Sequence, residues 1–239
     1  MSSLKNKVAL ITGGTKGIGY GIAQSLMQEG IHVAITGRSQ SSVDEAANLL
    51  NNYSSSGAKA IGLEADVRNF ESQQKAVDAV LKHFGYLDVV VANAGLGHFA
   101  SVENLTLEQW QEVIDTNLTG AFYTIKASVE ALKQSKGYYI TISSLAGTNF
   151  FANGSAYNAS KFGLTGFTQA VMLDLRPHGV KVSTIMPGSV ATYFNNHQPG
   201  DNDAWKIQIE DIGELVVDLL KMNPRTLPSK IEVRPSIPK

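Results

Sequence analysis

The chain has 239 residues, no cysteine and a formal net charge of −1. This length predicts one domain with a large core, and the near-neutral charge gives no electrostatic footprint for nucleic acid or an anionic membrane. The absence of cysteine excludes disulfides and thiolate metal sites, and the five scattered histidines show no ligand spacing, so we expect no metal. Without a signal-like apolar segment near residue 1 or an apolar run approaching the ~20 residues of a membrane span, we expect a soluble cytoplasmic protein.

The first motif is a glycine-rich turn between a strand and a helix. Residues 8–12 are apolar, the segment 13–19 reads Gly-Gly-Thr-Lys-Gly-Ile-Gly, and a helical pattern follows. Glycine lets the backbone approach a pyrophosphate, and the helix N-terminus binds its charge. A tight turn is the alternative, but the position of the motif in the first strand–helix unit favours a dinucleotide site. Its candidate residues are Gly13, Thr15, Lys16, Gly17, Ile18 and Gly19.

The second strand, predicted over residues 32–36, bears on the choice of cofactor. An acidic residue at the end of this strand would hold the ribose 2′-hydroxyl of NAD. No acid occurs between His32 and Val43; Arg38 stands in that place, and Lys16 lies in the glycine turn. These cations could neutralise a 2′-phosphate, which predicts NADP(H), whereas the alternative is two solvated surface charges.

The middle of the chain continues the alternation of strands and helices. We expect a helix opened by a capping box at Ser42, a strand over 60–65 ending at Asp66 and Val67, and an amphipathic helix over 70–84. An apolar strand over 87–92 then ends in Asn93, Ala94 and Gly95. A long helix capped at Thr106 is expected to run to about residue 132 and contains Asn117.

A strand and a helix in the second half of the chain carry the reactive groups. Residues 139–142 read as a buried strand with Ser143 and Ser144 at its end, and the segment after Ser155 reads as a helix. Tyr157 and Lys161 are four residues apart, so they share one face of that helix. A phenol has a pKa near ~10, and a fixed cation one turn away favours the phenolate. This combination suits proton transfer to a carbonyl oxygen.

The remaining segments complete the architecture. We expect a strand over 181–186, a loop over approximately 193–206, a helix over 210–222 and an edge strand over 230–233. The alternation predicts an α/β fold: a doubly wound, Rossmann-type, mostly parallel seven-stranded sheet with helices on both faces, in a single domain over residues 1–239. Every candidate site residue then falls at the carboxyl end of a strand or on the helix that leaves it, where such sheets bind ligands.

Ser144 precedes Tyr157 by thirteen residues, and together with Lys161 and the glycine turn this spacing resembles the short-chain dehydrogenase/reductase family. The similarity covers nearly the whole chain and is to the NADP-preferring carbonyl reductase and 3-oxoacyl-carrier-protein reductase branch. It implies that Ser144 holds the substrate oxygen and Tyr157 is the general acid. It also implies that Lys161 binds the ribose hydroxyls and that the Asn117 carbonyl holds a water linking this lysine to solvent.

The resemblance implies further cofactor contacts. Asp66 would bind the adenine amino group beside Val67, and Asn93, Ala94 and Gly95 would lie near the nicotinamide ribose. At the nicotinamide ring it implies contacts from four residues of one segment, Pro187, Gly188, Val190 and Thr192, with Thr192 bonding the carboxamide.

Apolar side chains are expected around the substrate: Leu96, Phe150, Phe151, Tyr193 and Phe194. They favour an apolar or aromatic ketone and a small-molecule carbonyl reductase. The alternatives are a 3-oxoacyl-carrier-protein or 3-oxoacyl-CoA reductase, a non-catalytic NADP-binding sensor or scaffold, and the sugar-nucleotide epimerase branch, whose glycine spacing differs. The surplus of apolar residues on helices 107–132 and 156–175, with the family resemblance, predicts a homo-oligomer, a tetramer or a dimer.

Overall fold

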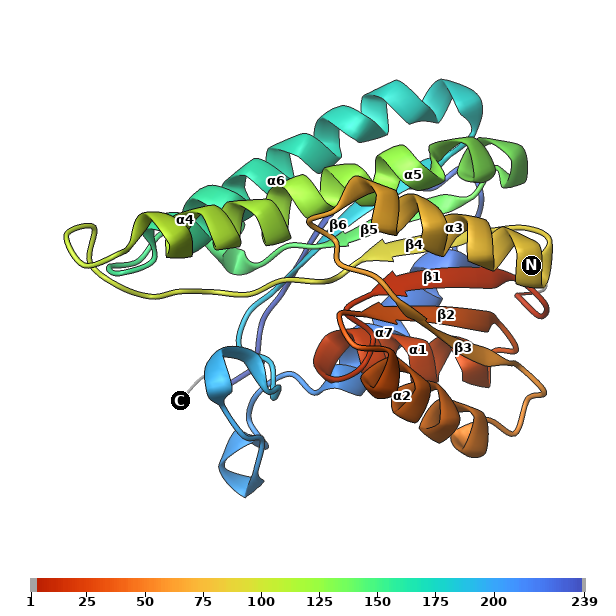
Figure 1. Cartoon of the computed structure of the whole chain (residues 1–239), viewed down its shortest axis with the longest axis horizontal. Coiled ribbons are helices and arrows are strands. Elements are labelled where there is room, and N and C mark those ends of the chain that lie inside the picture. Colours follow the sequence, from red (N-terminus) through yellow and green to blue (C-terminus); the bar gives the residue numbers. More distant parts are fainter. Residues whose placement is uncertain (1–3, 238–239) are drawn as a thin grey trace.

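Seven short, mainly apolar segments form one parallel sheet in the computed structural model, which describes residues 4–237 (Figure 1). The strands are β1 (Val8–Thr12), β2 (His32–Gly37), β3 (Ala60–Glu64), β4 (Val89–Ala92), β5 (Tyr138–Ile142), β6 (Lys181–Pro187) and β7 (Lys230–Val233). Their order across the sheet is β3-β2-β1-β4-β5-β6-β7, and every pair is parallel. The predicted doubly wound sheet is confirmed.

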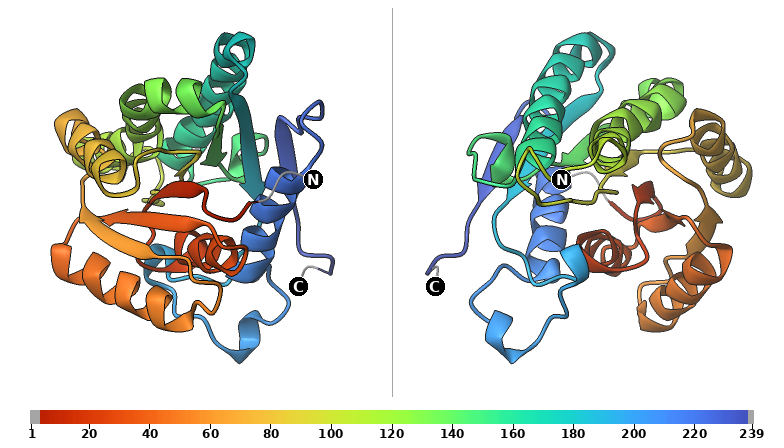
Figure 2. Two further views of the ribbon diagram at one scale, coloured as in Figure 1. Left: turned by 90° about the vertical axis from the view of Figure 1, so that its right-hand side faces the viewer. Right: turned by 60° about the vertical axis from the view of Figure 1, so that its left-hand side comes forward.

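Helices cover both faces of this sheet (Figures 1 and 2). One face carries α1 (Gly17–Gln28), α2 (Gln40–Tyr53) and α7 (Ile209–Lys221); the other carries α3 (Phe70–Phe84), α4 (Leu107–Ile114), α5 (Gly120–Ser135) and α6 (Ser155–Leu175). Alternate residues of a strand point to opposite faces. In β1, Ala9 and Ile11 join the core under α1, α2 and α7, while Val8 and Leu10 join the core under the other layer.

The strand order reverses between β1 and β4, because β2 and β3 extend the sheet on one side of β1 and the chain then returns to add β4 on the other side. Loops leaving the carboxyl ends of β1 and β4 therefore diverge, and such a switch point is where open α/β sheets bind ligands. The segment between β6 and α7 lies at this same end of the sheet, drawn in light blue in Figure 1. No helix within residues 4–237 combines the length and the apolar character that crossing a membrane requires.

Two expected helix boundaries differ from the structure. The capping box at Thr106 is confirmed, but the long helix that it opens contains a π-helical turn, Asp115–Thr119, and continues to Ser135. The capping box at Ser42 is wrong. The helix α2 begins at Gln40, since Ser39 keeps an extended backbone immediately after β2 and the chain turns helical at once.

Candidate active site

A cleft of about 790 Å³ opens at the carboxyl ends of the strands. Most predicted site residues line it: Gly13, Thr15, Lys16, Gly17, Ile18, Arg38, Asp66, Val67, Asn93, Ala94, Gly95, Leu96, Ser144, Tyr157, Lys161, Pro187, Gly188, Val190, Thr192, Tyr193 and Phe194. Gly19, Asn117, Phe150 and Phe151 are not part of this lining. The fold thus gathers segments from the whole length of the chain around one cleft.

The glycine turn after β1 is packed tightly against the end of β4. Gly13 and Gly17 have positive φ angles of 64° and 59°, which glycine adopts without strain. A Cβ atom on Gly19 would lie 2.5 Å from both Asn93 Nδ2 and the Gly13 carbonyl oxygen. The same Asn93 amide donates hydrogen bonds to the carbonyl oxygens of Thr12 (2.9 Å) and Gly13 (3.1 Å). Only a turn without side chains at these positions closes in this way.

The N-terminus of α1 faces the cleft and carries no capping side chain. Its N-cap residue, Lys16, makes no side-chain cap bond, and no acidic residue occurs in the first turn. The free amides and the helix dipole therefore favour an anion there. With the glycine turn beside it, this helix start fits the pyrophosphate of a dinucleotide.

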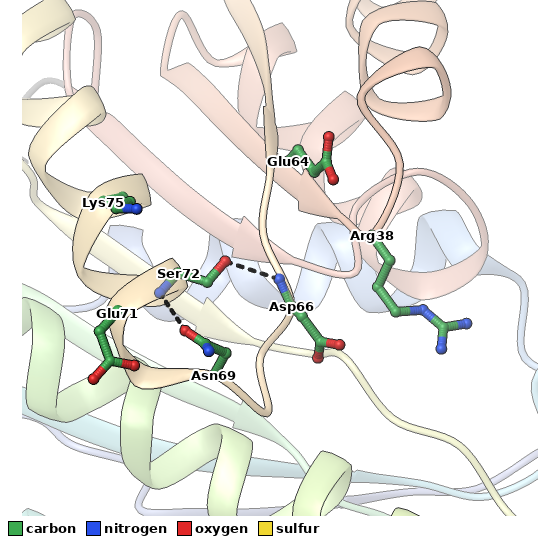
Figure 3. A pocket seen from close by; sticks show the side chains of 7 residues that line it. All are labelled: Arg38, Glu64, Asp66, Asn69, Glu71, Ser72 and Lys75. Atoms are coloured by element: carbon green, nitrogen blue, oxygen red, sulfur yellow. Dashed lines mark hydrogen bonds between the residues drawn. The ribbon is translucent and has the colours of Figure 1, made fainter.

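Arg38 follows β2 and lies between the main cleft and a second, polar hollow of about 680 Å³. Figure 3 shows the side chains at this hollow, with Asp66 between Arg38 and the residues at the start of α3. Lys16 also lines the main cleft, and its Nζ lies 5.8 Å from the centre of the Tyr193 ring. The two predicted phosphate-binding cations therefore both reach the cleft, from separate loops.

The carboxylate of Asp66 already has a partner within the chain. Arg68 donates to it from Nη2 (2.7 Å) and Nε (3.1 Å), and this hydrogen bonding lowers the pKa of Asp66. Arg68 also reaches Glu112 on α4 at 3.6 Å, and Glu112 in turn lies 2.8 Å from His98 Nε2. Sequence reasoning missed this network, because the pairing of Asp66 with Arg68 has no distinctive local pattern and the other members, His98 and Glu112, lie on distant segments.

Ser144, Tyr157 and Lys161 meet at the carboxyl end of β5. Ser144 Oγ accepts a hydrogen bond from the Ala146 amide (3.1 Å) and lies 3.5 Å from the Pro187 carbonyl oxygen. The buried Lys161 donates from Nζ to the Ile142 carbonyl (2.9 Å), and Nζ lies 5.7 Å from the centre of the Tyr157 ring. A hydroxyl, a phenol and an ammonium group thus share one corner of the cleft.

Burial dominates the electrostatics of this corner. It lowers the pKa of Lys161 to about 8. It also raises the pKa of Tyr157, with a smaller opposing contribution from the Ser144 hydroxyl. The sequence predicts that Lys161 favours the phenolate, but in this structure the rings of Phe99 and Phe194 pack on Tyr157 at 5.4 and 5.6 Å between ring centres. Desolvation by these neighbours outweighs the nearby charge.

Asn117 supports the corner from behind rather than lining it. It lies in the π-helical turn and is buried. Its amide donates to the Leu96 carbonyl (2.8 Å) and to Ser160 Oγ (3.0 Å), and its oxygen accepts from the Leu96 amide (2.8 Å). Asn117 therefore joins the loop after β4 to α6, where Tyr157 and Lys161 lie.

The aromatic residues expected around the substrate separate into two groups. Tyr193 and Phe194 line the cleft, whereas Phe150 is 86% exposed and Phe151 packs against Phe99 at 5.9 Å between ring centres. The position of Phe150 differs from the expectation because residues 149–153, after the short helical turn Leu145–Gly147, form an exposed segment. Phe99 instead contacts Tyr157 directly.

Comparisons with known proteins agree with this geometry. A "trans-4-hydroxycyclohexanecarboxylate dehydrogenase" of Sinomonas cyclohexanicum is 39% identical over 189 residues, covering 78% of this chain and 73% of that protein. An alcohol dehydrogenase from Thermococcus sibiricus, complexed with 5-hydroxy-NADP, is 31% identical with a TM-score of 0.91 and covers 98% of both chains. A metagenomic short-chain oxidoreductase in complex with NADP is 31% identical, has a TM-score of 0.85, and covers 99% of this chain and 100% of that one. The short chain dehydrogenase family model matches residues 7–203, and the chain therefore belongs to this family of oxidoreductases.

Proposed function

We propose that this chain is an NADPH-dependent oxidoreductase that reversibly reduces a ketone to a secondary alcohol, with Tyr157 as the general acid. The observation that carries the proposal is the convergence of Ser144, Tyr157 and Lys161 in one corner of a cleft whose other end is a glycine cradle with an uncapped helix N-terminus. NADPH, when bound in that cradle, supplies the hydride. Its pyrophosphate would be held by the glycine turn from Gly13 to Gly19.

The residues of the corner divide the remaining work. The Ser144 hydroxyl donates a hydrogen bond to the carbonyl oxygen and orients it. Tyr157 gives its phenolic proton to that oxygen as negative charge develops, which is general acid catalysis. The Lys161 ammonium lies close enough to the Tyr157 ring to stabilise the phenolate that remains. Asn117 bonds both to the loop that follows β4 and to α6, and so fixes the distance between them at the corner.

Cofactor preference rests on the cations at the ribose end. Lys16 and Arg38 line the cleft, and two similar structures are complexes with NADP or 5-hydroxy-NADP. We expect Arg38→Asp to lower the ratio of kcat/KM for NADPH to that for NADH by about 10- to 100-fold, since a charge-assisted hydrogen bond is replaced by repulsion. Arg225→Asp, at an exposed position between α7 and β7, changes the net charge equally and is the control. A preference of the unmutated enzyme for NADH would contradict the proposal.

The substrate side of the cleft has an apolar character, which comes from Leu96, Phe99 and Phe194. This favours an apolar or aromatic ketone over a thioester delivered by an acidic carrier protein. The test is NADPH oxidation against ketones, β-ketoesters, diketones and 3-oxoacyl thioesters on CoA and on carrier protein. Higher kcat/KM for an aryl or cyclic ketone supports the small-molecule reading. An advantage of more than a hundredfold for the carrier thioester, lost on adding salt, would replace it with the 3-oxoacyl reductase. NADPH binding without turnover of any of these compounds would favour a sensor or scaffold.

We also expect a homo-oligomer, a dimer or a tetramer. Large apolar side chains on α4, α5 and α6 are exposed by about two fifths or more, among them Trp110, Phe122, Phe162 and Leu173. Single exposed apolar residues need no explanation, but a set on adjacent helices marks an interaction surface. Light scattering at micromolar concentration should give a mass of two or four chains, and Phe122→Glu should shift it toward the monomer. A monomer in the unmutated protein would refute this prediction.

A further inference from the structure

The segment between β6 and α7 is closed into a loop by its own ends. Val190 and Ile207 form an isolated parallel bridge, with the Ala191 amide donating to the Ile207 carbonyl (2.9 Å) and the Ile207 amide donating to the Ser189 carbonyl (3.1 Å). Residues 192–206, all of which the structure describes, project from this bridge at the mouth of the cleft. Figures 1 and 2 show the loop standing away from the sheet, so the sheet itself does not hold its tip.

One buried carboxylate organises this loop. Asp203 is the one residue of 192–206 that is buried, and its side chain is 8% exposed. Its oxygens lie 2.6 Å from His197 Nε2 and 2.6 Å from Lys206 Nζ, and one accepts from the Gly200 amide at 3.1 Å. These contacts lower the pKa of Asp203 far below its usual range, chiefly through the hydrogen bond with Lys206. A loop without an apolar core is thus gathered around a single charge.

One partner of Asp203, His197, follows Phe194 by three residues, and the Phe194 ring packs on Tyr157. Phe194 is followed by Asn195 and Asn196, both with left-handed backbones (φ 54° and 61°), and then by His197. Asparagine tolerates this conformation better than most residues, but two in succession hold the chain in one sharp turn. The position of His197 against Asp203 therefore fixes where the Phe194 ring can lie.

The Phe194 ring reaches across the cleft to the opposite wall. Its centre lies 5.6 Å from that of Tyr157 and 6.2 Å from that of Phe99. A Cβ atom on Gly97 would lie 2.9 Å from Phe194 Cζ and 2.8 Å from Phe99 Cζ, so both rings occupy space that the missing side chain leaves. The two phenylalanine rings form an apolar enclosure around the phenol of Tyr157.

We propose that Asp203 is a positioning residue for substrate binding. By binding His197, Lys206 and the Gly200 amide, it holds the loop in one conformation. In that conformation a substrate ring packs against Phe194, beside Tyr157. This inference rests on the proposed ketone reductase function. A planar or cyclic ketone can stack on these rings, whereas a small acyclic ketone makes little contact with them. The loop is organised before the substrate arrives, which reduces the entropy lost on binding.

The test compares Asp203→Asn with Asp201→Asn in the full-length protein. Asp201 lies on the same short helical turn, is exposed and has no hydrogen-bonded or ionic side-chain partner among residues 4–237, so the control changes the net charge equally. Hydrogen–deuterium exchange of peptides covering residues 194–206 is measured without cofactor or substrate. We expect exchange about tenfold faster in Asp203→Asn and unchanged in Asp201→Asn, because buried charged hydrogen bonds are lost only in the first.

Kinetics then test the link to Phe194. For an aryl ketone we expect Asp203→Asn to raise KM by about tenfold while kcat changes by less than about twofold. The free energy needed to order the loop then weakens substrate binding and does not enter the chemical step. Phe194→Ala should raise the same KM and leave exchange around Asp203 slow. For acetone, KM should change little in either variant.

The outcomes are separable from those of the proposed function. Loop exchange in Asp203→Asn equal to that of the unmutated protein overturns the role of Asp203, whatever the enzyme reduces. Faster exchange with an unchanged KM for the aryl ketone overturns the role of Phe194 as the wall. If no ketone is reduced by the unmutated protein, the proposed function fails, while the exchange experiment still decides whether Asp203 holds the loop.

Discussion

Tyr157→Phe is expected to lower kcat by ~10²–10⁴-fold while NADPH still binds, because the variant lacks the proton that general acid catalysis transfers. The phenylalanine ring keeps the contacts with Phe99 and Phe194, so the enclosure around it should stay intact. The effect should therefore appear in kcat and kcat/KM together, the signature of an interaction made only in the transition state.

Tyr138→Phe is the matched control for this prediction. Tyr138 is buried at the start of β5, and its hydroxyl pairs with Ser183 at 2.7 Å, at the opposite end of the strand from Ser144. Loss of that hydrogen bond should reduce stability by about 1 kcal/mol and leave kcat nearly unchanged. NADPH oxidation measures kcat, and fluorescence titration measures the binding of NADPH, in both variants. A Tyr157→Phe enzyme with near-normal kcat would remove Tyr157 from the mechanism.

The sequence was sufficient for the elements whose signals are local. An apolar strand followed by a glycine turn and a helix predicts the tight turn at Gly13–Gly19, because Gly13 and Gly17 have positive φ angles and Gly19 leaves no room for a side chain. Helical spacing predicts that Tyr157 and Lys161 share one helix face, and the spacing from Ser144 with the family resemblance identifies them as site residues. Even the edge strand β7, a short segment with half-buried side chains, was expected at residues 230–233.

Features that depend on packing between distant segments could not be predicted. The π-helical turn around Asn117 leaves no composition signal, since it is stabilised by bonds to Leu96 and Ser160, 21 and 43 residues away. The pairing of Asp66 with Arg68 shows the same limit at short range. An Asp-Val-Arg sequence does not reveal whether the arginine folds back onto the carboxylate or points into solvent.

The aromatic residues near the substrate show a further limit. Phe150 and Phe99 are both loop residues, and sequence alone does not show whether either side chain points toward the cleft or into solvent. In the structure Phe99 turns inward because Gly97 leaves room for it, and Phe150 remains exposed. Likewise, the segment 193–206 has the composition of a mobile loop, but the structure shows it gathered around Asp203.

Lys161→Met is expected to lower kcat by ~10²–10³-fold, because the preorganised charge beside the phenolate is lost. The family resemblance implies that Lys161 contacts the ribose, so Lys161→Met should also weaken NADPH binding, whereas Tyr157→Phe should leave it unchanged. A third, independent effect concerns stability. Burial lowers the pKa of Lys161 to about 8 in the folded protein, whereas a lysine in the unfolded chain has a pKa near ~10.4.

The sign of this effect follows from proton binding. Below pH 8 both states hold the proton, and the folded state bears the full penalty of a buried charge. Between pH 8 and about 10.4 the unfolded chain binds more protons than the folded one, so this residue makes stability rise with pH, by about 3 kcal/mol in total. Lys161→Met has no such contribution. The difference in unfolding free energy, unmutated minus variant, should therefore be flat up to pH 7.5 and then increase toward pH 10.5.

Urea denaturation at a series of pH values measures this difference, and groups that titrate in both proteins cancel in it. Lys82→Met, at an exposed position on α3, is the control and should give a difference that stays nearly constant over the same range. Parallel curves for the unmutated protein and Lys161→Met would show that Lys161 keeps an ordinary pKa. In that case the ammonium is not desolvated. The proposal that it stabilises the Tyr157 phenolate strongly, which requires a water-poor environment, would then have to be abandoned.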